Sequence, residues 1–198
     1  MENSKFKTII GDCKHGLVAV PQSPEYLLKE MVAEHPFYTM HRLNQIAAFE
    51  EIHEYKPIVY GGLAFSPLKS TGGKHTSWIS ISNIANHMEL CTQKGLQIQF
   101  QNSNNPVLLD ITEYFLKKRR NETEKVQRFH DSMHCQYRLA STDDYQDEYK
   151  RTKYKGFKEH PTEFEAFCVR DSIRRTLDEI GYAYTPEILD GLVKKQMV

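Results

Sequence analysis

Two histidines stand at a spacing that could bind a metal ion. His130 and His134 lie four residues apart in the stretch VQRFHDSMHCQY, with Asp131 between them. On a helix, this spacing places both imidazoles on one face, one turn apart, where both can reach a single ion. Apolar residues recur at steps of three and four over residues 126–137, which predicts such a helix.

A third metal ligand is available later in the chain. The stretch HPTEFEA places Glu163 and Glu165 in the first turn of a helix that is predicted to begin at Pro161. A carboxylate on a rigid element can complete a zinc site that two histidines begin. The sequence therefore offers Glu163 and Glu165 as candidates for a third ligand beside His130 and His134.

This order of motifs resembles a known family. A helical H-x-x-x-H, a loop and then a helix beginning E-x-x-A or E-x-E-A resembles the zinc metallopeptidases of the gluzincin type, in particular the compact zincin-like proteins of bacteria and large phages. The resemblance covers roughly residues 121–180. It implies a zinc site formed by His130, His134 and Glu163, which stands three residues before Ala166, with Glu165 as the alternate ligand. It also implies amide hydrolysis by a zinc-bound water. The family's general-base glutamate is replaced by the shorter Asp131, which implies a weak or degenerate peptidase.

The sequence also suggests two alternative functions. His75 and His160 each begin an H-x-[ST] motif, which resembles the paired motifs of two-histidine phosphoesterases. The other alternative is a non-enzymatic protein that binds or inhibits a protein or peptide partner through its surface. The Tyr-rich stretch at residues 141–159 is the natural candidate for that surface, because aromatic residues are favoured at interfaces.

Composition limits the partners and the compartment. Lys and Arg together number 26, as do Asp and Glu, so the formal net charge gives no indication of a nucleic-acid partner. No apolar run is long enough to span a membrane. The four cysteines are scattered, and no signal-peptide pattern follows the first residues, so a cytoplasmic location is expected.

The first half of the chain is predicted to be rich in strands. Short strands are expected at residues 8–10 and 17–20, and again within residues 57–65, 75–82 and 96–101. Two early helices are also expected. One occupies residues 24–33 after a capping Ser23, and a longer one is capped by Thr39.

The second half is predicted to be helical. One amphipathic helix is expected over residues 107–118, closed by the basic run at residues 117–120, with the His130 helix starting anew after Asn121. The helix from Pro161 should stop at Gly181, and a shorter one should follow Thr185. The predicted fold is therefore α+β, with a small, mostly antiparallel sheet from residues 1–105 packed against helices from residues 106–198 in one domain.

Overall fold

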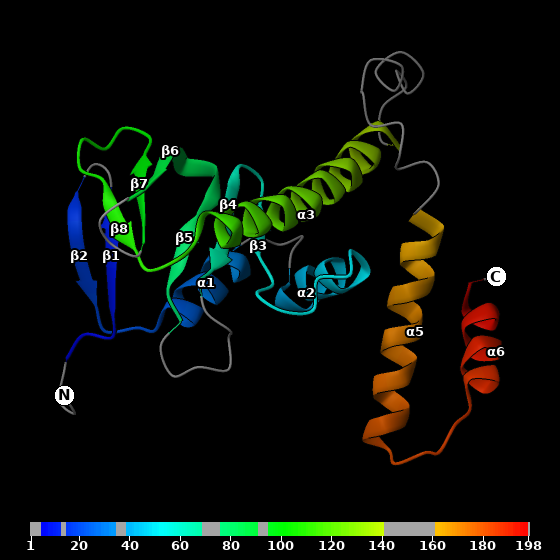
Figure 1. Ribbon diagram of the computed structural model, residues 1–198. Helices are drawn as coiled ribbons and strands as arrows, with labels where there is room; N and C mark the ends of the chain where they lie inside the picture. The colour runs from blue at the N-terminus through cyan, green and yellow to red at the C-terminus, as the bar shows by residue number, and fades with distance from the viewer. Residues whose placement is uncertain are drawn as a thin grey trace. The chain divides into compact units, whose positions relative to one another are not determined.

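The computed structural model describes residues 5–12, 15–34, 39–68, 76–90, 95–140 and 161–197, and only the backbone of residues 134–140 and 161 (Figure 1). The chain divides into two compact units, Met1–His130 and Asp131–Val198. The division falls inside one long helix, α3 (Glu113–Ala140). Compact units do not by themselves decide how many domains fold independently, so the single domain over residues 1–198 remains a prediction.

The first unit holds three small antiparallel sheets, and the α+β class is confirmed. Where one sheet was expected, the described strands form separate groups of two, three and three. Their bounds are β1 (Thr8–Asp12), β2 (Gly16–Val20), β3 (Ile58–Tyr60), β4 (Leu63–Pro67), β5 (Trp78–Ser80), β6 (Ile84–Glu89), β7 (Leu96–Phe100) and β8 (Val107–Leu109). The sheet orders are β1-β2, β3-β4-β5 and β6-β7-β8.

Two capped helices cover one side of the β3-β4-β5 sheet. Helix α1 (Pro24–Ala33) follows Ser23, whose side chain accepts a hydrogen bond from a backbone N–H in the first turn. Helix α2 (Met40–Phe49) follows Thr39, whose side chain accepts the equivalent hydrogen bond. Both predicted caps are confirmed. The two helices and the sheet share one core cluster, formed by Leu28, Val32, Leu43 and Ile58.

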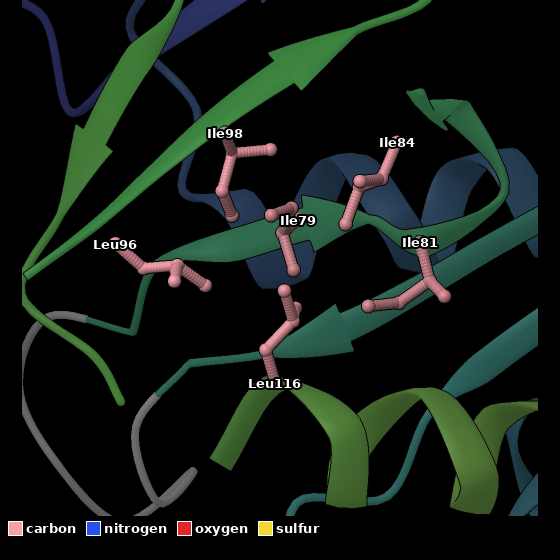
Figure 2. Close-up of a cluster of buried hydrophobic side chains, with 6 residues drawn as sticks. All are labelled: Ile79, Ile81, Ile84, Leu96, Ile98 and Leu116. Carbon is pink, nitrogen blue, oxygen red and sulfur yellow. The ribbon is translucent and has the colours of Figure 1, made fainter. Parts of the chain in front are cut away.

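A second core cluster joins α3 to the sheets. Figure 2 shows Leu116 of α3 among five apolar side chains that come from β5, β6, β7 and the 3-10 turn η1 (Ile81–Asn83). Leu116 is 1% exposed, and Leu96 and Ile98 are 0% exposed. Burying a leucine side chain contributes about 2 kcal/mol, so this contact fixes α3 to the sheets. The first turns of α3 therefore have a defined inner face.

Helix α3 corrects two expectations from the sequence. The first helix was expected to begin at residue 107, but Val107–Leu109 is strand β8 and the helix begins at Glu113. The helix was also expected to end at the basic run and to restart after Asn121, but it continues without a break to Ala140. Residues 117–120 therefore lie inside a helix.

The second unit contains two helices that match their predictions. Helix α5 (Pro161–Glu179) begins at the predicted proline, and α6 (Pro186–Gln196) is capped by Thr185. Arg170 of α5 forms an ion pair with Asp190 of α6. None of the described helices is both long enough and apolar enough to span a membrane.

Candidate nucleic-acid interface

Helix α3 has a buried face that continues through its basic run. The buried positions are Leu116, Arg119, Thr123, Val126 and His130, at steps of three and four residues. Phe129 adds to this face, because its ring centroid lies 5.5 Å from that of Phe49 on α2. The inner face is thus held along most of the helix in the first unit. The opposite face is left to solvent.

The solvent-facing side carries a stripe of basic and uncharged polar residues that we call the α3 basic face. Its members are all exposed, and they recur at steps of three and four residues except for the adjacent pair Lys117 and Lys118. They are Tyr114, Lys117, Lys118, Asn121, Lys125 and Arg128. The set contains four cations and no carboxylate, although the exposed Glu124 borders it. Tyr114 is 77% exposed, so its phenol is available to a partner.

At its N-terminal end, the basic face meets a carboxylate. The Nζ of Lys117 lies 2.8 Å from Oε1 of Glu113, one turn earlier. The Nε2 of His87 on β6 lies 3.4 Å from the same oxygen. The hydrogen bond from Lys117, followed by the one with His87, lowers the pKa of Glu113 below that of an ordinary glutamate. Glu113 therefore remains an anion at neutral pH.

Arg119 has a structural role despite its place in the basic run. Its side chain is 3% exposed, and its Nη2 lies 2.7 Å from a carboxylate oxygen of Glu122. Its Nη1 makes long hydrogen bonds, of 3.4 and 3.5 Å, to the backbone carbonyls of Glu54 and Tyr55. Arg119 therefore joins α3 to the chain after α2, and its charge does not reach the surface.

The sequence-predicted metal ligands are distributed over both units. His130 is 1% exposed and belongs to the first unit. Asp131 is half-buried, whereas Glu163 and Glu165 are exposed, and these three belong to the second unit. The side chain of His134 lies outside the described residues. Among the side chains that the structure describes, no three His, Cys, Asp or Glu are grouped so that they could hold a metal ion.

The comparisons with known proteins identify the family. An α+β protein with a cationic helix face has the general features of a nucleic-acid-binding protein. The family model described as "ComK protein" matches residues 18–134, which is more than half of the chain. The chain therefore belongs to the ComK family, whose members are competence transcription factors. No curated protein and no solved structure matches the chain significantly.

This family assignment overturns the metallopeptidase interpretation. The chain matches a family of transcription factors and no zincin family, so the predictions of a zinc hydrolase and of its H-D-x-x-H motif were wrong. A helical H-x-x-x-H arises easily by chance in a chain with nine histidines. The general-base role of Asp131 depended on the peptidase interpretation and is not retained. The zinc ligand set of His130, His134, Glu163 and Glu165 stays an untested prediction.

The two alternative functions are not better supported. The phosphoesterase interpretation is contradicted by the same family match, and its His75 and His160 lie outside the described residues. The Tyr-rich stretch at residues 141–159, the surface suggested for a protein-binding role, also lies outside them. Neither alternative explains the family match.

Sequence reasoning overlooked the α3 basic face because it treated the basic run as the end of a helix. A signal was nevertheless present. Lys118, Asn121, Lys125 and Arg128 continue one helical stripe across the supposed break. A single uninterrupted helix explains that stripe, and the structure has one.

Proposed function

We propose that this chain is a DNA-binding transcription regulator and that it contacts DNA through the α3 basic face. The observation that carries the function is the match of residues 18–134 to the ComK family, which is a family of transcription factors. The basic face lies within that match over its whole length. Transcription factors act with DNA or with proteins, so an additional protein partner fits the same proposal.

The zero net charge of the chain does not oppose this proposal. Net charge reports a sum over all residues, whereas DNA responds to charges that lie close together on one surface. The α3 basic face gathers four cations on one side of a helix, and Glu113 and Glu124 lie at its borders. The expectation of no nucleic-acid partner rested on the sum alone and is set aside.

The chemistry of the face suits both parts of DNA recognition. Lys118, Lys125 and Arg128 can neutralise backbone phosphates, which supplies affinity and its dependence on salt. Asn121 stands between them and carries both a donor and an acceptor, the pattern that pairs with the edge of adenine. An α-helix about 10–12 Å across fits the major groove, which is about 12 Å wide. A rigid helix positions these groups together.

Equilibrium binding to a fluorescein-labelled DNA duplex tests the proposal. The variant in which Lys118, Lys125 and Arg128 are all replaced by Gln should bind at least about tenfold more weakly. The slope of log affinity against log salt should fall by about one for each lost phosphate contact. The matched control replaces the exposed Lys29, Lys194 and Lys195 by Gln, which changes the charge equally at other places.

The outcomes separate the function from the site. The control variant should bind DNA much more tightly than the α3 variant at every salt concentration. If the wild-type chain shows no affinity for duplex DNA, the proposed function is wrong. If the wild-type chain binds and the α3 variant keeps its affinity and salt slope, the function stands and the assignment of α3 as the interface is wrong.

A further inference from the structure

One carboxylate oxygen is shared by two groups at the N-terminal end of the α3 basic face. Oε1 of Glu113 lies 2.8 Å from Nζ of Lys117 and 3.4 Å from Nε2 of His87. His87 comes from β6, so the contact joins the β6-β7-β8 sheet to the first turn of α3. The side chain of His87 is 19% exposed, that of Glu113 36% and that of Lys117 63%. The exposed fraction of the side chain thus increases from His87 through Glu113 to Lys117, which belongs to the basic face.

A second carboxylate binds at the same end of α3. Glu89 lies two residues further along β6. Its Oε1 accepts a hydrogen bond from the backbone N–H of Glu113 at the start of α3, with a distance of 3.4 Å between N and Oε1. The residues of β7 and β8, which pair along this sheet, carry no charge. The charged groups that hydrogen bonds and ion pairs join to His87 and Glu113 are therefore Lys117 and Glu89.

The charge of this group depends on whether the imidazole is protonated. With a neutral His87, the charges of Glu113 and Lys117 cancel, and the end of the basic face has no net charge. A protonated His87 donates its Nε2–H to Glu113, so the carboxylate is then shared between two cations and the group has a charge of plus one. The ion pair between Glu113 and Lys117 is then weaker, so the ammonium group of Lys117 binds a phosphate more readily. Histidine makes this change between about pH 5 and 8.

We infer that His87 controls the affinity of the α3 basic face for DNA: when its imidazole takes up a proton, Glu113 holds Lys117 less tightly and DNA binds more strongly. This inference depends on the proposed function. It makes Glu113 and His87 positioning residues that act through Lys117 without touching DNA. Because linkage is reciprocal, bound DNA must favour the protonated imidazole by the same factor by which the proton favours DNA binding.

Fluorescence anisotropy with a fluorescein-labelled duplex, measured at about pH 6 and about pH 8 and at one ionic strength, tests this inference. The wild-type chain should bind about two- to fivefold more tightly at the lower pH, the range that one exposed ion pair can supply. His87→Gln should lose this gain. His41→Gln, which changes an exposed histidine on α2, is the matched control and should keep it.

A second variant guards against loss of the fold in His87→Gln. Glu113→Gln gives the group a charge of plus one at the higher pH, the charge that the wild-type group has at the lower pH. It should therefore bind DNA at about pH 8 as tightly as the wild-type chain does at about pH 6.

The results distinguish two kinds of failure. No binding of the duplex by the wild-type chain at either pH overturns the proposed function and this inference with it. Binding with an equal gain at low pH in the wild-type chain and in His87→Gln overturns this inference alone. Glu113→Gln with the weak wild-type affinity at the higher pH also overturns it. Loss of the gain in His87→Gln, together with tight binding by Glu113→Gln, supports it.

Discussion

The guanidinium carbon of Arg119 lies 4.6 Å from the centre of the Tyr55 ring, on the buried side of the helix that presents the basic face. The same carbon lies 5.3 Å from the ring centre of Phe115. Tyr55 itself has a φ of +51°, a backbone conformation that costs free energy in a residue other than glycine. Arg119 therefore holds a strained position by stacking on the ring and by binding the adjacent carbonyls.

Replacement of Arg119 should reduce stability. Arg119→Lys keeps the charge, but it loses the planar fork that pairs with Glu122 and stacks on Tyr55. We expect the free energy of unfolding to fall by about 1–3 kcal/mol in urea titrations. Lys118→Gln, at the exposed neighbouring position, should change it by less than about 0.5 kcal/mol. Equal stability of the two variants would contradict the structural role of Arg119.

The two faces of α3 should respond differently to truncation. Leu116→Ala removes a side chain that is 1% exposed and lies in the core of Figure 2, so the free energy of unfolding should fall by about 2–5 kcal/mol. Tyr114→Ala, on the exposed face, should change it by no more than about 0.5 kcal/mol and should weaken DNA binding. Circular dichroism during urea unfolding measures the first effect, and fluorescence anisotropy measures the second. A large loss of stability in Tyr114→Ala would show that this face is packed.

Gly95 is required at the start of β7. Its φ is +144°, and a Cβ added there would lie 2.9 Å from the carbonyl oxygen of Leu109 on β8. Gly95→Ala should therefore lower the free energy of unfolding by about 1–3 kcal/mol. Gly62→Ala is the control, since a Cβ there meets nothing within 4 Å. A melting temperature in Gly95→Ala equal to that of Gly62→Ala would contradict this prediction.

The Glu113 carboxylate should titrate at lower pH than an ordinary glutamate. Hydrogen bonds from Lys117 and then with His87 lower its pKa, so its interactions favour the folded state when the carboxylate is charged. This contribution is present above the unfolded-state pKa of about 4.3 and is lost as the pH falls through the lower folded-state value. NMR titration of the side-chain carboxyl should show the lower pKa in the wild-type chain and its return towards the ordinary value in Lys117→Gln.

Local rules predicted several elements correctly because local interactions decide them. Ser23 and Thr39 accept backbone N–H groups at the helix starts where their types and positions predicted it. Pro161 and Thr185 likewise mark the starts of α5 and α6. A cap depends on residues within one turn, so the sequence alone contains what is needed. The starts of these four helices followed from such signals, whereas α2, which was expected to be longer than α1, has the same ten residues.

The continuity of α3 could not be read from hydrophobicity. Its buried stripe passes through Arg119 and Thr123, two polar residues that a pattern of apolar side chains does not count. Thr123 satisfies its hydroxyl by donating to the carbonyl of Arg119 at 2.7 Å. The pair Asn121 and Glu124 imitates a helix start, and together these residues suggested a break that the structure does not have.

The proposed function was missed for a related reason. The spacing of His130 and His134 is a strong signal on a helix, but it does not distinguish a metal site from a buried side chain, and His130 is buried in the first unit. The cations of the α3 basic face were visible in the sequence. That they lie on one side of a helix follows only when Lys118 and Lys125 belong to the same helix, as they do in the structure. The net charge of the chain gave no sign of these cations, because an equal number of acidic residues brings it to zero.

Under the proposed function, the uninterrupted course of α3 also limits the length of DNA that one copy of the chain can cover with this face. At a rise of 1.5 Å per residue, the distance along the axis from Tyr114 to Arg128 is about 21 Å. Base pairs in B-DNA are stacked about 3.4 Å apart, so the face can span at most about six base pairs, a little more than half a turn of the duplex. A protected segment much longer than this would require a second copy of the chain or a second DNA-binding surface.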